Sequence, residues 1–175
     1  ASHKGLDLVC ETLDGFMEKD MQLVVLGKGD GKYETFFSWA QSKYPGRVAV
    51  HLGYSESLAM QIYAGADLFL MPSKSEPCGL SQMIAMRYGA VPIVRETGGL
   101  KDTVHAYEAW NGEGNGFSFT NYNAGDMCHV ICEAVDLYHS RPEAYRQLQK
   151  RGMAEDFSWA RSAEKYRGIY RSICK

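Results

Sequence analysis

Short apolar runs alternate with longer amphipathic stretches along most of this chain. The apolar runs are rich in β-branched residues, which is typical of strands covered on both faces. They predict strands at Gln22–Gly27, Arg47–Leu52, Asp67–Met71, Val91–Arg95 and Phe117–Phe119. Strands and helices in strict alternation indicate an open parallel sheet with helices on both faces, so the predicted fold class is α/β and Rossmann-like.

The amphipathic stretches predict helices between these strands, at Gly5–Glu18, Lys32–Tyr44, Glu56–Ala64, Ser81–Tyr88 and Leu100–Trp110. Three more helices are predicted after Asn123, at Asp126–His139, Glu143–Ala154 and Arg161–Ile173. We expect this helical tail to cover the sheet rather than to form a second domain. Helix-terminal residues support the boundaries: Ser55 as an N-cap, Gly89 after a helix and Pro142 at a helix start.

Helix-forming residues begin at Lys4, so no strand precedes the first predicted helix in this sequence. A sheet of this kind opens with a strand that lies in its middle. We therefore expect residues 1–175 to form one domain whose sheet has a gap, belonging to a larger protein that supplies this strand.

Composition excludes several classes of function. With 45% hydrophobic residues among 175, the chain can bury a core. A net charge of −2 from 19 basic and 21 acidic residues offers no basic field for nucleic acid and no polybasic membrane patch. No run reaches the roughly 18 apolar residues of a membrane span, and no signal peptide is recognisable. Five cysteines, an odd number, indicate reduced thiols, and Cys128 and Cys132 lack the second pair of a zinc site.

Ser73–Gly89 carries the strongest chemical signal, because it follows a predicted buried strand and opens a predicted helix. Pro77 and Gly79 delay the helix and let backbone approach a ligand closely. Backbone N–H groups of Gly79, Leu80 and Ser81 would then point outward at the helix N-terminus, which favours a phosphate. Open parallel sheets also bind ligands at this edge, beyond the carboxyl ends of their strands.

Three further candidates each allow two interpretations. Glu76 is either a cap of the following helix or a carboxylate for sugar hydroxyls and developing positive charge. The turn Thr97-Gly98-Gly99 either faces a ligand or is only a turn. Tyr54 at a strand end either packs in the core or stacks on a base. None of the five histidines has metal-site spacing, so no metal is expected.

Several motifs resemble those of ADP-glucose-dependent glycogen and starch synthases. The signature of that family is similar to Ser75–Gln82, Ala85–Gly89, Pro92–Arg95 and Asp102–Val104. Ser2–Leu8 resembles the segment after the first strand of the family's C-terminal domain, and Phe157–Trp159 resembles its closing helix. The resemblance covers nearly the whole chain.

The resemblance implies a GT-B architecture, two Rossmann-like domains facing a cleft, of which this chain is the second. It implies that Lys4 contacts the donor's phosphates, that Tyr54 borders the base and that Glu76 lies at the transferred glucose. It places the donor also against the backbone of Cys78, Gly79 and Leu80, with Ser81, and near the turn Thr97, Gly98 and Gly99.

The implied reaction is transfer of glucose from ADP-glucose to the non-reducing end of an α-1,4-glucan with retention of configuration, with no cofactor. The implied location is a bacterial cytoplasm or a plastid stroma. The family's N-terminal domain, with its acceptor surface and a histidine near the reaction centre, has no counterpart here. An arginine that the family carries five positions before Lys4 is also absent, so we expect the isolated chain to be inactive.

Two alternatives stay open. One is another retaining GT-B transferase of the sucrose or trehalose-phosphate type. Those relatives carry a second glutamate eight positions after the first, where this chain has Ile84. The other is a binding-only fragment without activity.

Overall fold

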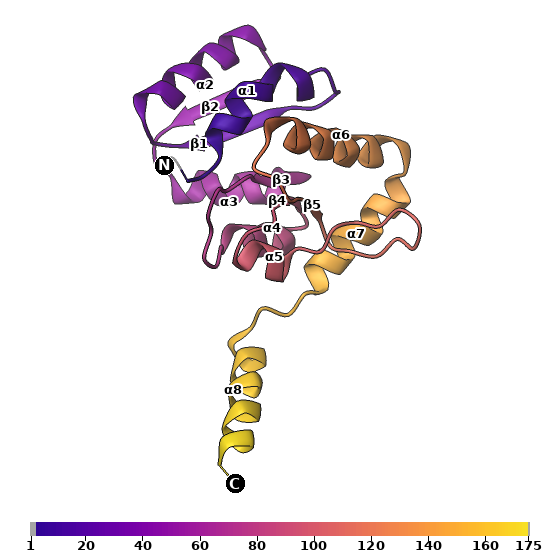
Figure 1. The fold of residues 1–175 in the computed structure, drawn as a ribbon. Coiled ribbons are helices and arrows are strands. Elements are labelled where there is room, and N and C mark those ends of the chain that lie inside the picture. The colour runs from indigo at the N-terminus through magenta and orange to yellow at the C-terminus, as the bar shows by residue number, and fades with distance from the viewer. Residues whose placement is uncertain (1–2, 175) are drawn as a thin grey trace.

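The computed structural model describes residues 3–174, which form alternating strands and helices (Figure 1). The strands are β1 (Leu23–Gly27), β2 (Val48–Leu52), β3 (Leu68–Met71), β4 (Val91–Arg95) and β5 (Phe117–Phe119). The helices are α1 (Leu6–Phe16), α2 (Gly31–Lys43), α3 (Glu56–Gly65), α4 (Ser81–Tyr88), α5 (Gly99–Thr103), α6 (Ala124–Ser140), α7 (Pro142–Ala154) and α8 (Trp159–Ile173). None of these helices is long and apolar enough to cross a membrane.

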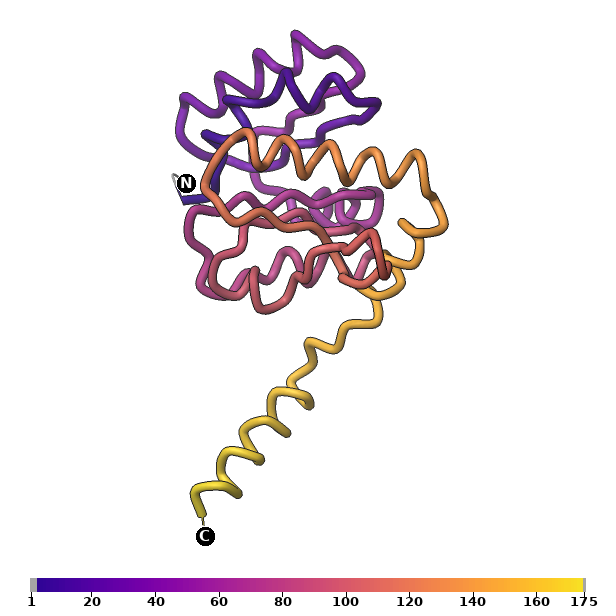
Figure 2. Tube along the Cα trace, turned by 45° about the vertical axis from the view of Figure 1, so that its right-hand side comes forward, coloured from indigo at the N-terminus to yellow at the C-terminus, as the bar shows by residue number. Residues whose placement is uncertain are grey.

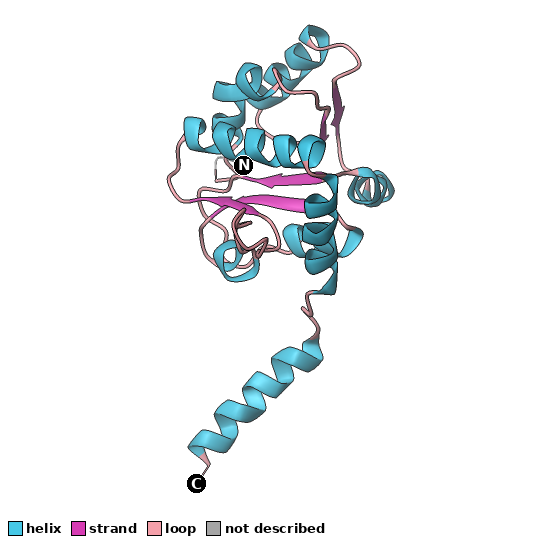
Figure 3. Cartoon of the chain, turned by 90° about the vertical axis from the view of Figure 1, so that its right-hand side faces the viewer, coloured by secondary structure: helices cyan, strands magenta, loops and turns pink. Residues whose placement is uncertain are grey.

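The strands are parallel but form two separate groups (Figure 3). One group pairs β1 with β2, with Leu23 opposite Val48, and the other has the order β3-β4-β5. The described strands are therefore interrupted between β1 and β3. The α/β class and the Rossmann-like parallel arrangement are confirmed.

Two apolar clusters cover the sheet from opposite sides. The larger joins α1, α2 and α6 to the strands through side chains such as Leu13, Phe16, Ile93 and Met127. The smaller lies under α4 and α5 and contains Met71, Met86, Val94, Leu100 and Val104. Because β4 contributes Ile93 to one cluster and Val94 to the other, it is buried on both faces, as its unbroken apolar run predicts.

The predicted helix boundaries hold where capping chemistry is local. Ser55 caps α3 by accepting from the Leu58 amide at 3.3 Å, Gly89 ends α4 with φ 90°, and Pro142 is the first residue of α7. Strand ends agree with the prediction to within one residue.

The prediction of a helix over Leu100–Trp110 is wrong, because α5 ends at Thr103. Asn115 causes the early end: its Nδ2 donates to the Thr103 carbonyl at 3.1 Å and its Oδ1 accepts from the His105 amide at 2.8 Å. Val104 is then extended and buried, and Ala106 bridges to Gly116. The Asn115 side chain, distant in sequence, thus provides hydrogen-bond partners for the backbone groups at the end of α5.

The expectation that the helical tail covers the sheet holds for α6 and α7 but is wrong for α8. The α7 residues Tyr145 and Leu148 are buried, and the Tyr145 hydroxyl donates to the Asp67 carbonyl at the start of β3. By contrast, α8 has no buried residue and projects away from the body (Figures 1 and 2). Its sequence is amphipathic, but no described element lies against its apolar side.

Replacing Asn115 tests the inferred end of α5. Asn115→Ala leaves the Thr103 carbonyl and the His105 amide without partners inside the protein, which we expect to cost about 2–3 kcal/mol of unfolding free energy. The matched control is Asn111→Ala, which removes an exposed amide of the same loop and should cost under about 0.5 kcal/mol. Urea denaturation of both variants gives the comparison, and equal losses would contradict the role given to Asn115.

Candidate functional site

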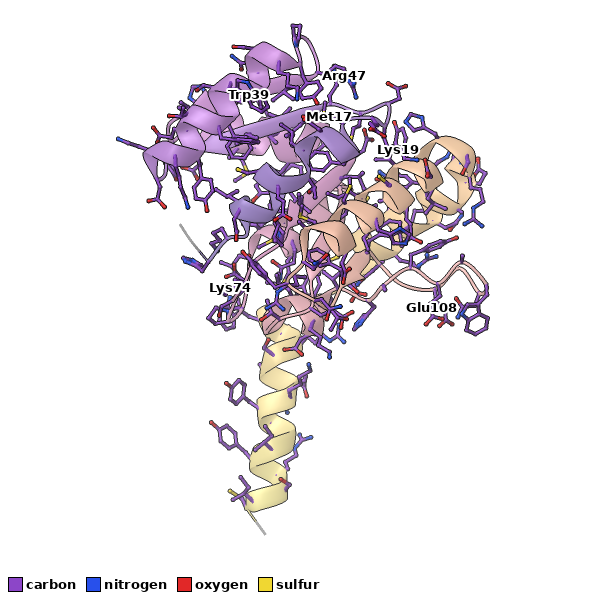
Figure 4. The ribbon with its side chains drawn as sticks, turned by 45° about the horizontal axis from the view of Figure 1, so that its top comes forward. Met17, Lys19, Trp39, Arg47, Lys74 and Glu108 are labelled. Atoms are coloured by element: carbon purple, nitrogen blue, oxygen red, sulfur yellow. The ribbon has the colours of Figure 1, made fainter. Side chains whose placement is uncertain are left out.

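Two loops meet at the carboxyl edge of the three-stranded group: residues 72–80 after β3 and residues 96–98 after β4. Figure 4 shows Lys74 on the first of these loops. Gly98 has φ 46°, and a Cβ there would collide with the Glu76 carbonyl oxygen. At Gly99 a Cβ would collide with the Cys78 carbonyl, and the Gly99 amide donates to the Pro77 carbonyl at 3.2 Å. The two glycine-containing segments singled out from the sequence are thus in direct backbone contact.

The start of α1 joins the same place. Gly5, the N-cap residue, has φ 74°, and any Cβ there would collide with the Pro72 carbonyl. In addition, the Lys74 amide donates to the His3 carbonyl at 2.8 Å. Residues 3–5 are therefore fixed on the loop after β3. Ser2, the first residue of the motif at this end, lies outside the described residues.

Lys4 and Glu76 form an ion pair across this contact. Lys4 Nζ lies 2.5 Å from Glu76 Oε2, and Ser73 Oγ donates to the same oxygen at 3.4 Å. The Glu76 side chain is only 13% exposed, while that of Lys4 is 46% exposed. Glu76 is not a helix cap, because the N-cap of α4 is Leu80 and no side chain caps that helix. The capping interpretation of Glu76 is therefore wrong.

Gln82 shapes the N-terminus of α4. Its buried Nε2 donates to the Gly79 carbonyl at 2.8 Å and to Thr103 Oγ1 at 3.1 Å, which ties the turn to α5. Gly79 has φ 73°, and a Cβ there would collide with the Gln82 side chain. Leu80 is exposed and Ser81 half-buried, so a ligand can reach the uncapped first turn. Such a turn presents N–H groups and a positive dipole end to an anion.

Arg95, at the end of β4, supports the Glu76 loop from behind. Its guanidinium donates to the carbonyls of Ser73 at 2.9 Å and Lys74 at 2.6 Å, and to that of Thr120 at 3.2 Å. Sequence reasoning placed Arg95 in a strand and gave it no role. The sequence pattern that could have identified Arg95 is a charged residue at the end of an apolar strand, at the edge of the sheet where ligands bind.

Tyr122 ties the loop before α6 to the first turn of α1. Its hydroxyl donates to Asp7 Oδ1 at 2.5 Å, and its ring lies beside the Arg95 guanidinium at 5.6 Å. Burial, and then the hydrogen bond to Asp7, raise the pKa of Tyr122 to about 12. The hydroxyl therefore stays a donor at neutral pH, and this second residue missed by sequence reasoning helps to hold α1 in place.

Tyr54 is not brought into this group. It follows β2 in the other strand pair, is 90% exposed and makes no hydrogen bond to the described part of the Glu76 loop. The core-packing interpretation of Tyr54 is wrong, because its side chain is exposed to solvent. Thr97 is half-buried, and its carbonyl accepts from the Leu100 amide at 3.1 Å, so the turn also starts α5. Residues 3–174 contain no cluster of three or more metal-ligating side chains.

Comparison with known proteins places this chain among glycosyltransferases. A glycogen synthase of Bacillus cereus (strain B4264) is 56% identical over 170 residues, which are 97% of this chain and 36% of that protein. The catalytic domain of starch synthase IV from Arabidopsis thaliana, bound to ADP and acarbose, superposes with a TM-score of 0.87 at 34% identity, over 100% of this chain and 37% of that one.

A sucrose-phosphate synthase from Thermosynechococcus elongatus superposes with a TM-score of 0.72 over 99% of this chain and 43% of its own, but at 22% identity it shows the fold alone. The resemblance to glycogen and starch synthases is confirmed, and the chain spans about a third of its glycogen synthase relative. Since residues 1–153 match the family described as "Glycosyl transferases group 1", the chain belongs to that family.

Proposed function

We propose that this chain is the donor-binding domain of a retaining glucosyltransferase that extends an α-1,4-glucan from ADP-glucose. The observation that carries the proposal is the 56% identity to a glycogen synthase over 97% of the chain. The matching starch synthase is described as bound to ADP and acarbose, which favours the same donor here. The weaker sequence similarity to a sucrose-phosphate synthase, together with Ile84, argues against the sucrose type.

The contacts of Lys4 suit a role in holding a diphosphate. In this structure its ammonium pairs with Glu76, and the 46% exposure of the Lys4 side chain leaves part of the ammonium open to an anion. A phosphate can therefore bind the open side of Lys4 while the pair with the mostly buried Glu76 persists. The N-terminus of α4, formed by the Gly79–Ser81 turn, supplies N–H donors to the same anion. Together these groups would stabilise the leaving diphosphate without a metal or another cofactor.

Glu76 suits the sugar side of the donor. Its carboxylate is mostly buried and held by Ser73 and Lys4, and its backbone lies on Gly98, so its position is fixed. A fixed negative charge favours the positive charge that develops at the anomeric carbon. We propose front-side attack by the acceptor hydroxyl through an ion-pair-like transition state, which gives retention without a covalent intermediate. Cys78, Leu80, Thr97 and Tyr54 would complete the donor site through backbone, turn and base contacts.

The acceptor side is proposed to lie on a second domain. The chain covers 36% of its glycogen synthase relative, so acceptor binding and part of the catalytic machinery would belong to the remainder. The partners of this chain are then a nucleotide sugar, an α-glucan and the N-terminal domain of the same enzyme. A bacterial cytoplasm or a plastid stroma is the proposed location. A binding-only role is the alternative for the isolated chain.

The first prediction from the proposed function separates binding from turnover. Supplied with ADP-glucose and a glucan primer, the isolated chain should incorporate no labelled glucose, since the acceptor surface is proposed to lie elsewhere. Calorimetric titration with ADP should still detect binding with a dissociation constant of about 0.1–1 mM, and Lys4→Ala should weaken it about tenfold. Measurable elongation by the pure chain would overturn the proposed division of labour, and ADP binding unaffected by Lys4→Ala would remove Lys4 from the site.

The second prediction concerns Glu76 in the full-length transferase. Glu76→Gln keeps the size of the side chain but removes its charge, so the loss should fall on the transition state. We expect kcat to drop roughly 100-fold, about 3 kcal/mol, with less than a tenfold change in the KM for the donor. Glu133→Gln on the exposed side of α6 is the control and should leave both constants unchanged. Near-normal turnover of the Glu76 variant would sink the catalytic assignment.

The third prediction tests support of the Glu76 loop by Arg95. Lysine cannot reproduce the three carbonyl contacts of the planar guanidinium, so Arg95→Lys should lower kcat about tenfold in the full-length transferase. Arg87→Lys, which alters an exposed arginine with a single carbonyl contact, is the matched control. A loss of stability with unchanged kcat in the Arg95 variant would reduce its role to packing.

A further inference from the structure

An almost fully exposed tryptophan lies outside the proposed donor site. Among residues 3–174, three aromatic residues have this degree of exposure: Tyr54 (90%), Trp110 (83%) and Trp159 (90%). Tyr54 belongs to the proposed donor site, and Trp159 begins α8, which has no buried residue. Trp110 is in neither place, because it lies between α5 and β5. We call residues 105–116 the Trp110 loop.

The Trp110 loop has a defined backbone conformation. At its base the Tyr107 amide donates to the Gly116 carbonyl at 2.8 Å, and the Glu108 amide donates to the Glu113 carbonyl at 3.1 Å. The Gly112 amide closes the turn around Trp110 by donating to the Glu108 carbonyl at 2.7 Å. An ordered backbone thus holds an indole in water, which is typical of a binding surface, since tryptophan otherwise buries most of its area in a fold.

Helix α7 and Asn115 support the loop from the inside. Arg151 Nε donates to the Gly114 carbonyl at 2.5 Å, and Asn115 Nδ2 donates to Glu155 Oε1 at 3.1 Å. Gly114 has φ 97°, and a Cβ there would collide with the Ala106 carbonyl. A ligand at the turn would therefore meet a prepared surface, and little entropy would be lost in ordering the loop.

Two carboxylates lie beside the turn. Asn111 Nδ2 donates to Glu108 Oε2 at 2.8 Å, and Asn111 Oδ1 accepts from the Glu113 amide at 2.8 Å. Both glutamates are exposed, and no ion pair within residues 3–174 involves either of them. Since an ionised carboxylate only accepts hydrogen bonds and has about four positions for them, both have positions left for hydroxyl donors.

An indole with carboxylates beside it fits the two kinds of surface that a glucose unit offers. The C–H groups on one face of the sugar ring are apolar and pack on the electron-rich face of an aromatic ring. The hydroxyls at the edge of the sugar donate to carboxylates. Two carboxylates without a cation disfavour an anionic ligand. A single turn also cannot supply the roughly 800 Å² per partner that a stable protein interface buries, which favours a narrow ligand.

The Trp110 loop lies at the opposite edge of the sheet from the donor loops. It enters β5 at the amino end of that strand, whereas the loops with Glu76 and Gly98 follow the carboxyl ends of the parallel strands β3 and β4. Figure 4 shows Glu108 and Lys74 on opposite sides of the body. The glucan end that receives glucose must lie at the donor loops, so the Trp110 loop would hold another segment of the same polymer.

We propose that the Trp110 loop is a second binding site for an α-1,4-glucan, in which Trp110 stacks on a glucose ring and Glu108 and Glu113 accept hydrogen bonds from its hydroxyls. This inference rests on the proposed function, which supplies the class of polymer. One stacked ring binds weakly, with a dissociation constant of about 1–10 mM. On a long or branched glucan this contact raises the local concentration of chain ends at the donor site, because the second binding event becomes intramolecular.

The first test measures binding by the chain itself. Titration of the isotope-labelled chain with maltoheptaose, followed by NMR, should shift the Trp110 indole N–H and the amides of Asn111 and Glu113, with a dissociation constant of about 1–10 mM. Trp110→Ala should abolish the shifts of both amides, and Trp110→Tyr should keep them. Trp159→Ala, which removes another exposed indole, is the matched control and should bind like the unchanged chain. Because Trp110 is exposed, its replacement should leave the melting temperature unchanged.

The second test uses the full-length transferase. Trp110→Ala should lower kcat/KM for glycogen at least about fivefold, because the polymer loses its second contact. The value for maltotetraose should not change, since a primer of four units reaches only the acceptor cleft. The KM for ADP-glucose should also stay the same.

Unchanged NMR signals with maltoheptaose, or equal binding by the Trp110→Ala chain, would overturn the proposal. Self-association that depends on Trp110, detected by light scattering, would show that a second copy of the chain covers the turn and would overturn it too. If the transferase elongates maltotetraose but Trp110→Ala has no effect with glycogen, this inference fails alone. If it elongates no primer, the proposed function fails whatever the titration shows, so the two failures are distinguishable.

Discussion

Gly98 and Gly99 let the turn after β4 lie directly on the loop after β3, and the contacts among the candidate site residues depend on that approach. At Gly98 and Gly99 any Cβ would collide with carbonyls of Glu76 and Cys78. Gly5 does the same for the start of α1 against Pro72. Backbone-to-backbone contact leaves little freedom to these loops, so the side chains on them have fixed positions before a ligand arrives. This rigidity is what a site needs to place charge against a transition state.

Polar groups around this contact divide into supports and ligand-facing groups. Arg95, Gln82 and Tyr122 donate hydrogen bonds to backbone carbonyls and to the side chains of Thr103 and Asp7, and so hold the loops together. Lys4 and the N-terminus of α4 face outward. The Lys4 ammonium is half-exposed, and no side chain caps the positive end of the α4 dipole. The Arg95 guanidinium, bonded to three carbonyls, would be costly to move, whereas the half-exposed ammonium of Lys4 has donors left for a ligand. The supporting side chains thus hold the loops rigidly, while Lys4 and the N-terminus of α4 remain open to an anionic ligand.

Much of this fold could be predicted from the sequence, because its signals are local. Apolar runs such as Val91–Arg95 and caps such as Ser55 lie within a few residues of what they determine. The contacts that failed prediction join distant residues: Lys4 pairs with Glu76 across 72 positions, and Asn115 ends a helix that local propensity would continue. The resemblance to a family located Lys4 and Glu76 but not their contact with each other.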